Sequence, residues 1–416
     1  MSPSWPASHL VTLGVFGLVY LGMILGGLPR LSLDRTGIAL LGAITVVGAG
    51  VLTPEEAAAA VHLPTILLLF AFMVLSAQMR LGGFYSAITR RIAGPSLSPP
   101  QLMGAVVAAS GALSAVFSND IVCLAMAPVL ADACLRRRVD PVPYLLALAA
   151  ASNIGSAATL IGNPQNMLVG QVLALPFATY TRHALPPVVL GLAGLWALLT
   201  REVRTHEAAP AAPPPASGTV EPPPFDRWQT AKGLAVAFAL MAIFLASDWP
   251  RDVAALVGAG VLLLSQRFHS STVMGLIDWQ LLVLFMGLFV VNHAMALTGL
   301  APAALDWLGA HGVALGEPGA LAASTAILSN LVSNVPAVML LLPAAKAAAR
   351  PEAAGELLAL VSTFAGNLVV VGSIANIIVV DAARKAGIDI DWRRHARIGV
   401  PVTLATLTVT VLWLAL

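Results

Sequence analysis

The sequence FSNDIVCLAMAP at residues 117–128 places three polar residues in the middle of an apolar stretch. The sequence VSNVPAVMLLLP at residues 332–343 repeats the Ser-Asn pair and the closing proline at an offset of 215 positions, since 332 − 117 = 215. Ser, Asn and Asp are favoured at helix N-termini, and proline fits the first helical turn. Each stretch therefore predicts two helices joined by a polar tip. We predict helical hairpins at about 101–135 and 318–349.

The composition around these stretches is that of a helical membrane protein. Of the 416 residues, 58% are hydrophobic and 10% are charged, and the mean hydropathy is +0.87. Soluble domains contain about 45–50% apolar and about 25% charged residues, so the composition excludes an ordinary soluble enzyme. The net charge of +2 provides no basic surface for nucleic acid. Cys123 and Cys134 lie in one apolar stretch, which predicts buried free thiols rather than a disulfide or a metal site.

Apolar runs recur along the chain at lengths near the roughly 20 residues that cross a bilayer as a helix. We predict an all-α polytopic membrane protein in contact with the lipid bilayer. Besides the two hairpins, ten spans are predicted at about 10–28, 37–54, 63–79, 143–175, 184–200, 231–247, 252–266, 279–300, 355–380 and 398–416.

Basic residues indicate how these spans are oriented. If the N-terminus lies outside, all of the 22 Lys and Arg residues except Arg182, Arg251, Lys346 and Arg350 lie on the cytoplasmic side of the membrane. This distribution agrees with the positive-inside rule, and the opposite orientation reverses the ratio. We therefore predict a multi-pass protein of the plasma or inner membrane with its N-terminus outside.

A proline-rich segment divides the chain into two halves of similar length. Residues 205–225 combine seven prolines with Ala, Gly and Ser, a composition that does not pack a core. We predict a disordered or polyproline-like cytoplasmic linker at 201–230. The halves on either side are residues 1–200 and 231–416.

Further blocks recur between the halves. The sequence ILLLFAF at 66–72 resembles LLVLFMG at 281–287, again at an offset of 215, since 281 − 66 = 215. The sequence IGNPQN at 161–166 resembles VGSIAN at 371–376, at an offset of 210, since 371 − 161 = 210. An odd number of spans in each half makes the two copies opposite in orientation. Inverted repeats with interrupted helices are typical of secondary transporters, whose site lies near the middle of the membrane.

Two more polar interruptions, Gly155 to Asn166 and Gly366 to Asn376, lie in runs too long for one straight crossing. Non-helical backbone inside a membrane survives where it lines a cavity, so we predict a broken helix in each half. Helix N-termini suit an anion, and unwound carbonyls suit a cation. The candidate residues for binding substrate or ion are Ser118, Asn119, Asp120, Thr159, Gly162, Asn163, Asn166, Ser333, Asn334, Val335, Asn367, Gly372, Ser373 and Asn376.

Neither hairpin tip and neither break contains Lys or Arg. A bound anion would therefore rely on helix dipoles, amides, hydroxyls and a co-bound cation, and the same groups would also accept a neutral hydroxylated substrate. Sodium could bind in two places, near Ser118, Asn119 and Gly162 and near Asn334 and Gly372. No other metal and no organic cofactor is predicted, and the coupling ion is H⁺ or Na⁺. The alternative for these residues is a role in helix packing, which Ser, Asn and Gly also serve in membranes.

Asp120 is the acidic residue that lies midway through an apolar stretch. A carboxylate in the membrane interior costs roughly 2.5–3.5 kcal/mol on insertion scales and is a functional candidate for that reason. Asp120 could exchange a proton or hold a coupling cation, or it could serve only as a helix cap. Asp132 and Glu356 lie near helix ends, where we expect them to reach water.

At these motifs the sequence resembles the ion transporter superfamily, which includes divalent-anion/sodium symporters, citrate carriers, arsenite permeases of the ArsB type and NhaD-type antiporters. The family's hairpin tips correspond to residues 118–120 and 333–335, and its broken-helix loops to residues 159–166 and 372–376. The resemblance implies a homodimer in which a transport domain moves against a scaffold as an elevator.

The motifs point to more than one branch of the superfamily. Dicarboxylate symporters typically carry Ser-Asn-Thr at both tips, whereas Asp120 and Val335 occupy the third positions here. An Asn-Asp first tip with an Asn-x-Pro second tip is similar to the arsenite permease and NhaD branch. The loop at 159–166 resembles that of general anion permeases and NhaD-type proteins, with Asn163 in place of an acid often found there.

Three transport functions and one enzymatic function follow as hypotheses. The first is a secondary-active transporter of a small inorganic or carboxylate anion, coupled to H⁺ or Na⁺. The second is an arsenite or antimonite efflux permease that exchanges against H⁺, and the third is a Na⁺/H⁺ antiporter that uses Asp120. A single acid in the membrane interior disfavours the third. The sequence has no His-Glu-x-x-His motif, no Gly-x-Ser-x-Gly motif and no intramembrane acid pair, so a membrane-embedded enzyme is not predicted.

Overall fold

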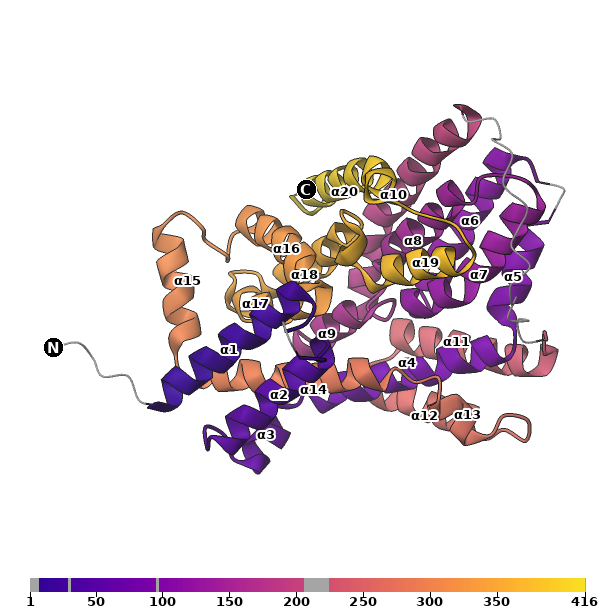
Figure 1. Ribbon diagram of the computed structural model, residues 1–416. Helices are drawn as coiled ribbons and strands as arrows, with labels where there is room; N and C mark the ends of the chain where they lie inside the picture. The colour runs from indigo at the N-terminus through magenta and orange to yellow at the C-terminus, as the bar shows by residue number, and fades with distance from the viewer. Residues whose placement is uncertain (1–6, 29–30, 95–96, 206–223, 416) are drawn as a thin grey trace.

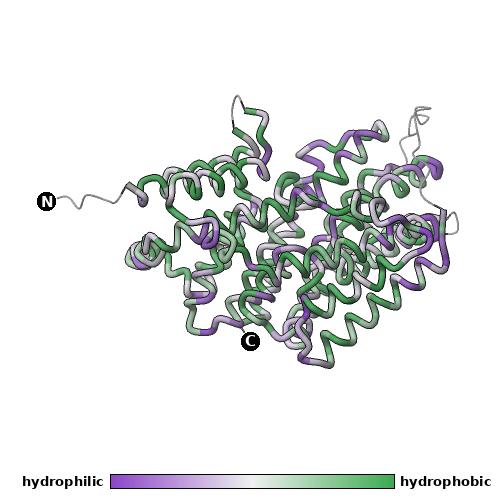
Figure 2. Tube along the Cα trace, turned by 90° about the horizontal axis from the view of Figure 1, so that it is seen from below, coloured by the Kyte–Doolittle hydropathy of each residue, from purple (hydrophilic) through white to green (hydrophobic). Residues whose placement is uncertain are grey.

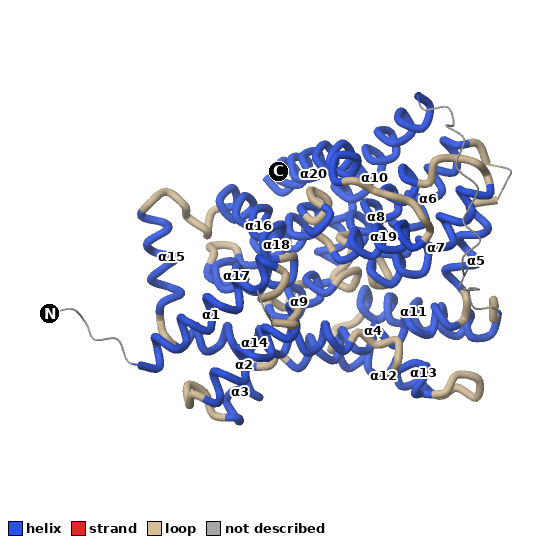
Figure 3. The backbone as a smooth tube through the Cα atoms, in the orientation of Figure 1, coloured by secondary structure: helices blue, strands red, loops and turns tan. Residues whose placement is uncertain are grey.

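The structure, a computed structural model, describes residues 7–28, 31–94, 97–205 and 224–415. This part of the chain is nearly all helical and contains no strand (Figures 1 and 3). The helices before the linker are α1 (Ala7–Leu25), α2 (Arg35–Gly48), α3 (Pro54–Ala60), α4 (Leu63–Leu81), α5 (Phe84–Ile92), α6 (Pro99–Ser114), α7 (Asn119–Arg136), α8 (Val142–Ser156), α9 (Pro164–Val172) and α10 (Phe177–Thr205). Those after it are α11 (Arg227–Ala246), α12 (Arg251–Leu263), α13 (Ser270–Met274), α14 (Trp279–Leu297), α15 (Leu300–Ala310), α16 (Pro318–Val332), α17 (Asn334–Ala347), α18 (Pro351–Ala365), the 3₁₀ helix η1 (Val370–Gly372), α19 (Ile374–Lys385) and α20 (Trp392–Ala415).

The same order of elements follows α4 and α14, which both contain 19 residues. Each is followed by a glycine in the left-handed conformation, Gly83 or Gly299, both with φ of 69°. Glycine adopts this conformation without strain, and the chain turns sharply there into a short helix, α5 or α15. A helix pair, a broken helix and a long helix then follow in both halves. Figure 1 shows α5 and α15 at opposite ends of the molecule, across the directions of α4 and α14.

The helices form two layers in the view of Figure 1. A lower layer contains α2, α4, α11, α12 and α14, and an upper layer contains α6, α8, α10, α18 and α20. Within the lower layer, α12 packs on α4 and α14 packs on α2, so each contact joins one helix from each half of the chain. Helix α9 packs on both α4 and α18 and so connects the two layers. The halves therefore interlock rather than form separate domains.

The chain is a multi-pass membrane protein by the length and composition of its helices. Figure 2 shows hydrophobic residues along most of the helices and hydrophilic residues mainly at helix ends and loops. In the described part, six helical segments are long and apolar enough to cross a membrane: Ser8–Leu25, Leu63–Leu81, Phe177–Val203, Arg227–Ala246, Trp279–Leu297 and Trp392–Leu414.

Four of the ten predicted spans differ from the structure. The runs 143–175 and 355–380 are each divided into two helices by the breaks that the sequence also predicted. The run 37–54 gives a 14-residue helix that ends at Gly48, because Gly50 turns the chain with a positive φ of 70°. The run 252–266 gives a 13-residue helix, α12, that ends at Leu263.

Helices extend into both ends of the predicted linker. Helix α10 continues to Thr205, five residues into the predicted linker at 201–230, and α11 begins at Arg227. Most of the proline-rich segment lies outside the described residues. The prediction for the cysteines is confirmed, since Cys123 and Cys134 are buried and free.

Candidate functional site

Two helix pairs carry the predicted tips. Helices α6 and α7 are joined by residues 115–118, and α16 and α17 are joined by Ser333 alone, which has a positive φ of 77°. Pro336 lies in the first turn of α17, as predicted. Ser118 and Ser333 occupy the N-cap positions of α7 and α17, but neither side chain makes a capping hydrogen bond. Their hydroxyls therefore remain available for other partners.

The first break consists of residues 157–163, between α8 and α9. It is narrower than predicted, because α8 continues through Gly155 to Ser156. The Asn163 side chain caps α9 by accepting a hydrogen bond from Asn166 N (2.9 Å), and Pro164 fills the first helical position. The break is also bonded to the first tip, because Asn119 N donates to Gly162 O (3.3 Å).

Two further side chains hold this break in place. Thr159 Oγ1 donates to Ala115 O of the first tip (2.5 Å). Asn166 Nδ2 donates to Thr159 O (3.1 Å) and to the Tyr180 hydroxyl (3.0 Å). Since these groups are buried, their hydrogen bonds fix the position of an otherwise irregular backbone.

The second break runs from Gly366 to Ser373 and contains η1. Ser373 Oγ caps α19 by accepting from Ala375 N (3.2 Å). Asn376 Nδ2 spans the break by donating to Gly366 O (2.8 Å) and Val369 O (3.2 Å). The two breaks thus use the same devices at equivalent positions, an N-cap side chain and an asparagine that reaches back across the loop.

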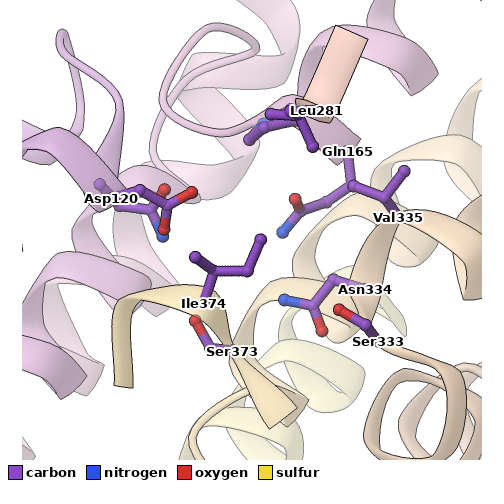
Figure 4. A pocket seen from close by; sticks show the side chains of 10 residues that line it. Asp120, Gln165, Leu281, Ser333, Asn334, Val335, Ser373 and Ile374 are labelled. Atoms are coloured by element: carbon purple, nitrogen blue, oxygen red, sulfur yellow. The ribbon is translucent and has the colours of Figure 1, made fainter. Parts of the chain in front are cut away.

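The first turns of the helices that follow the tips and breaks, α7, α9, α17 and α19, meet at one small cavity (Figure 4). Its volume is about 20 Å³, which is room for about one water molecule. Asp120, Gln165, Asn334 and Ser373 extend toward the same space in Figure 4. The lining residues are Asn119, Asp120, Pro164, Gln165, Leu281, Ser333, Asn334, Val335, Ser373 and Ile374.

The lining contains one carboxylate, that of Asp120, and no basic side chain. Among the described residues no group donates a hydrogen bond to this carboxylate, so Asp120 does not act as a helix cap. Asp278, the N-cap residue of α14, lies close enough to repel it electrostatically. The cavity is therefore polar and acidic, with amides and hydroxyls as its other hydrogen-bonding groups.

The structure divides the predicted site residues into two groups. Six line the cavity: Asn119, Asp120, Ser333, Asn334, Val335 and Ser373. The others do not line it, and most support the tips and breaks: Ser118, Thr159, Gly162, Asn163, Asn166, Asn367, Gly372 and Asn376. Four lining residues were not predicted from the sequence: Pro164, Gln165, Leu281 and Ile374. Pro164 and Gln165 lie inside the recognised loop motif, which was a usable signal, whereas Leu281 and Ile374 are apolar and gave none.

Buried oxygens without a hydrogen-bond partner lie beside each break. Ser114 Oγ and Asn119 Oδ1 occur at the first hairpin, and Ser329 Oγ and Asn330 Oδ1 occur at the second. A buried acceptor without a donor is unfavourable, and a cation can satisfy it. These positions adjoin the places predicted for sodium. No cluster of three His, Cys, Asp or Glu side chains suited to another metal occurs in the described part of the chain.

A helical membrane protein with paired hairpin tips and paired broken helices around one polar cavity has the architecture of a secondary transporter. Comparison with known proteins identifies the family. The family model described as citrate transporter (CitMHS) matches residues 19–365, and the chain belongs to this family. The family and its members are transporters, in agreement with the expectation that the chain is not an enzyme.

Individual relatives span almost the whole chain. The silicon efflux transporter LSI3 of Oryza sativa subsp. japonica is 28% identical over 94% of both chains. An uncharacterized transporter of Mycobacterium tuberculosis (strain ATCC 25618 / H37Rv) is 31% identical over 92% of this chain and 93% of its own. The crystal structure of the Alcanivorax borkumensis YdaH transporter matches with a TM-score of 0.56 over 98% of both chains at 17% identity, which shows a shared fold.

Proposed function

We propose that this protein is a secondary transporter that exchanges a small, uncharged, hydroxylated solute against protons, with Asp120 as the proton carrier. Metalloid acids such as arsenous and silicic acid are solutes of this type. The observation that carries the proposal is the charge of the cavity, which holds one carboxylate and no basic side chain. An anion there would face an uncompensated negative charge in a desolvated site.

The hydrogen-bonding groups of the cavity suit hydroxyls. Gln165 and Asn334 each offer an amide oxygen, because the Gln165 nitrogen donates to Thr363 Oγ1 (3.2 Å) and the Asn334 nitrogen donates to Gly372 O (3.2 Å) and Ser362 O (3.1 Å). Ser333 offers a hydroxyl that makes no capping hydrogen bond. A compact solute with several O–H groups can donate to these oxygens and accept from the Ser333 hydroxyl at once.

Competition at Asp120 accounts for exchange against protons. The ionised carboxylate accepts hydrogen bonds from the hydroxyls of the solute, and the protonated carboxyl loses part of that capacity. Solute and proton therefore favour different forms of the same site, which is the condition for counter-transport. A relative named silicon efflux transporter supports this substrate class.

A second candidate is a sodium-coupled symporter of a small anion. The unpartnered buried oxygens of Ser114, Asn119, Ser329 and Asn330 favour it, because bound sodium would satisfy them and offset the charge of an anion. In both candidates we propose an elevator movement in a homodimer, with the N-terminus outside and the linker in the cytoplasm. The distribution of basic residues supports the orientation.

Reconstituted vesicles test the proposal. A gradient of arsenite or silicic acid is imposed on vesicles that contain the protein, and a pH-sensitive dye records the lumen. We expect solute entry to drive protons out, and the effect to disappear in Asp120→Asn. The matched control is Asp132→Asn, which removes an exposed carboxylate from the same helix, α7.

Three results would reject this function. One is solute transport without proton movement, and another is the same proton movement in Asp120→Asn as in the unmodified protein. The third is transport of sulfate, phosphate or citrate that requires sodium, together with no transport of arsenite or silicic acid. The third result would establish the second candidate.

A further inference from the structure

Asn153 lies at the centre of a hydrogen-bond network that the sequence analysis did not predict. Its side chain is 1% exposed, in helix α8 of the first half. Asn153 Oδ1 accepts from Asn119 Nδ2 (3.0 Å) and from Ser373 Oγ (2.9 Å). Asn153 Nδ2 donates to Asn367 Oδ1 (2.8 Å) and to Asn376 Oδ1 (3.2 Å). One buried amide thus joins the first tip to the second break and uses its full hydrogen-bonding capacity.

Thr363 makes the reciprocal connection. It occupies the equivalent position in α18 of the second half, since 363 − 153 = 210, the offset that relates the two breaks. Thr363 Oγ1 accepts from Asn163 Nδ2 (3.2 Å) at the end of the first break and from Gln165 Nε2 (3.2 Å) in the first turn of α9. It donates to Ala359 O (2.8 Å) in its own helix.

We infer that Asn153 and Thr363 are positioning residues that each hold the broken helix of the opposite half in its binding geometry. Asn153 fixes Ser373, which lines the cavity, against Asn119, the neighbour of Asp120. Thr363 fixes the amide nitrogen of Gln165 and leaves its oxygen available to the cavity. The link between these contacts and transport rests on the proposed function.

This crossed arrangement has a physical consequence. A broken helix lacks the regular hydrogen bonds that hold a continuous helix, so its geometry depends on side-chain partners. Here some of those partners come from a helix of the opposite half. Loss of one of these side chains should therefore loosen the break that it contacts in the opposite half more than the break of its own half.

Hydrogen exchange of the full-length protein in detergent tests the inference without a known substrate. Asn153→Ala should accelerate exchange at residues 366–376 and at the first tip by about tenfold or more, because buried partners lose their hydrogen bonds. Thr363→Val keeps the shape of the side chain and should accelerate exchange at residues 159–166. The matched control is Gln78→Leu, which removes a buried amide pair with Gln229 in the lower layer and should leave both breaks unchanged.

Transport provides the second measurement. We expect the arsenite concentration for half-maximal flux to rise about tenfold in Asn153→Ala, together with a shifted pH profile, because solute groups and Asp120 are no longer held together. In Gln78→Leu both quantities should stay as in the unmodified protein, even where the melting temperature falls.

The inference is overturned if each substitution loosens the break of its own half as much as that of the opposite half. It is also overturned if Gln78→Leu gives the same pattern, or if Asn153→Ala changes only the melting temperature. If the crossed pattern holds but the unmodified protein carries neither arsenite nor silicic acid, the positioning role stands and the proposed function fails.

Discussion

Gly162 is the position where one added methyl group should test the contact between the first tip and the first break. A Cβ atom at Gly162 would lie 2.7 Å from Ser114 O and 2.7 Å from Ser156 Cα, and closer still to Ser156 O. All three neighbours are backbone atoms, so no side chain can rotate away. Gly162→Ala therefore requires the hairpin or the break itself to move.

The magnitude follows from comparison with other glycines. Inserting a methyl group into a packed core usually costs about 1–3 kcal/mol, and a backbone clash places Gly162→Ala at the upper end of that range. At the equivalent Gly372 the nearest atom is a side-chain atom, Asn330 Oδ1 at 2.7 Å, and the nearest backbone atom, Gly366 O, is 3.1 Å away, so Gly372→Ala should cost less. At Gly194 in α10 nothing lies within 4 Å, and Gly194→Ala should gain up to about 1 kcal/mol from helix propensity.

Thermal unfolding in detergent and vesicle transport measure these effects. The expected order of melting temperature is Gly194→Ala at or above the unmodified protein, then Gly372→Ala, then Gly162→Ala. Transport should be lost in Gly162→Ala even in the fraction that remains folded, because the displaced tip carries Asp120. The reasoning is refuted if Gly372→Ala is as destabilising as Gly162→Ala, or if Gly162→Ala transports normally.

Substitutions at three other contacts give further tests. His183→Ala removes the partner of the buried Glu356 carboxylate (2.9 Å) and should lower the free energy of unfolding by about 1–3 kcal/mol. Glu356→Gln should lower it by less, and equal losses of the two variants in thermal unfolding would contradict this. Arg251→Met removes the hydrogen bond to Gly170 O (3.0 Å) that joins α12 to α9 and should lower the free energy of unfolding by about 1 kcal/mol. The control is Lys385→Met, which removes an exposed ion pair with Asp381 and should change the free energy of unfolding less. Backbone hydrogen bonds from Gln229, together with Arg267 and Trp228, hold the pKa of Asp226 below its usual value at the start of α11. The stabilisation that ionised Asp226 gives to the folded protein is therefore present above about pH 4 and is lost as the pH falls further. The melting temperature of Asp226→Asn should vary less with pH below about pH 4 than that of the unmodified protein. An identical pH dependence of the two proteins would contradict this assignment.

The sequence was sufficient for the helical membrane fold, both hairpins and both breaks because their signals are local. Ser, Asn, Gly and Pro interrupt apolar runs at positions that repeat between the halves, and the structure interrupts its helices there. The short helices α5 and α15 were not predicted. They are too short for a membrane span, and their starting turns depend on single glycines, Gly83 and Gly299, in a chain rich in glycine.

Within the site, the cavity-lining residues at the tips were predictable from the sequence. The residues that support the tips and breaks without lining the cavity were only partly predictable. Asn153 and Thr363 were missed because each lies inside an apolar helix, where a packing role is the ordinary interpretation of a polar residue. They differ in type, although the identical neighbours Ser152 and Ser362 were a usable signal, since 362 − 152 = 210. Glu356 was expected to reach water from a helix end, but it is buried against His183, a contact that depends on how α10 packs on α18.

The most direct test of the central claim is proton release on solute binding. Purified protein in weakly buffered detergent is titrated with arsenite at a series of pH values, while a pH indicator counts released protons. If the solute and a proton compete for Asp120, the release should rise to at most about one proton per bound solute at the pH where Asp120 is protonated. Asp120→Asn should release none. Binding without release at any pH, or equal release in Asp120→Asn, would contradict the account.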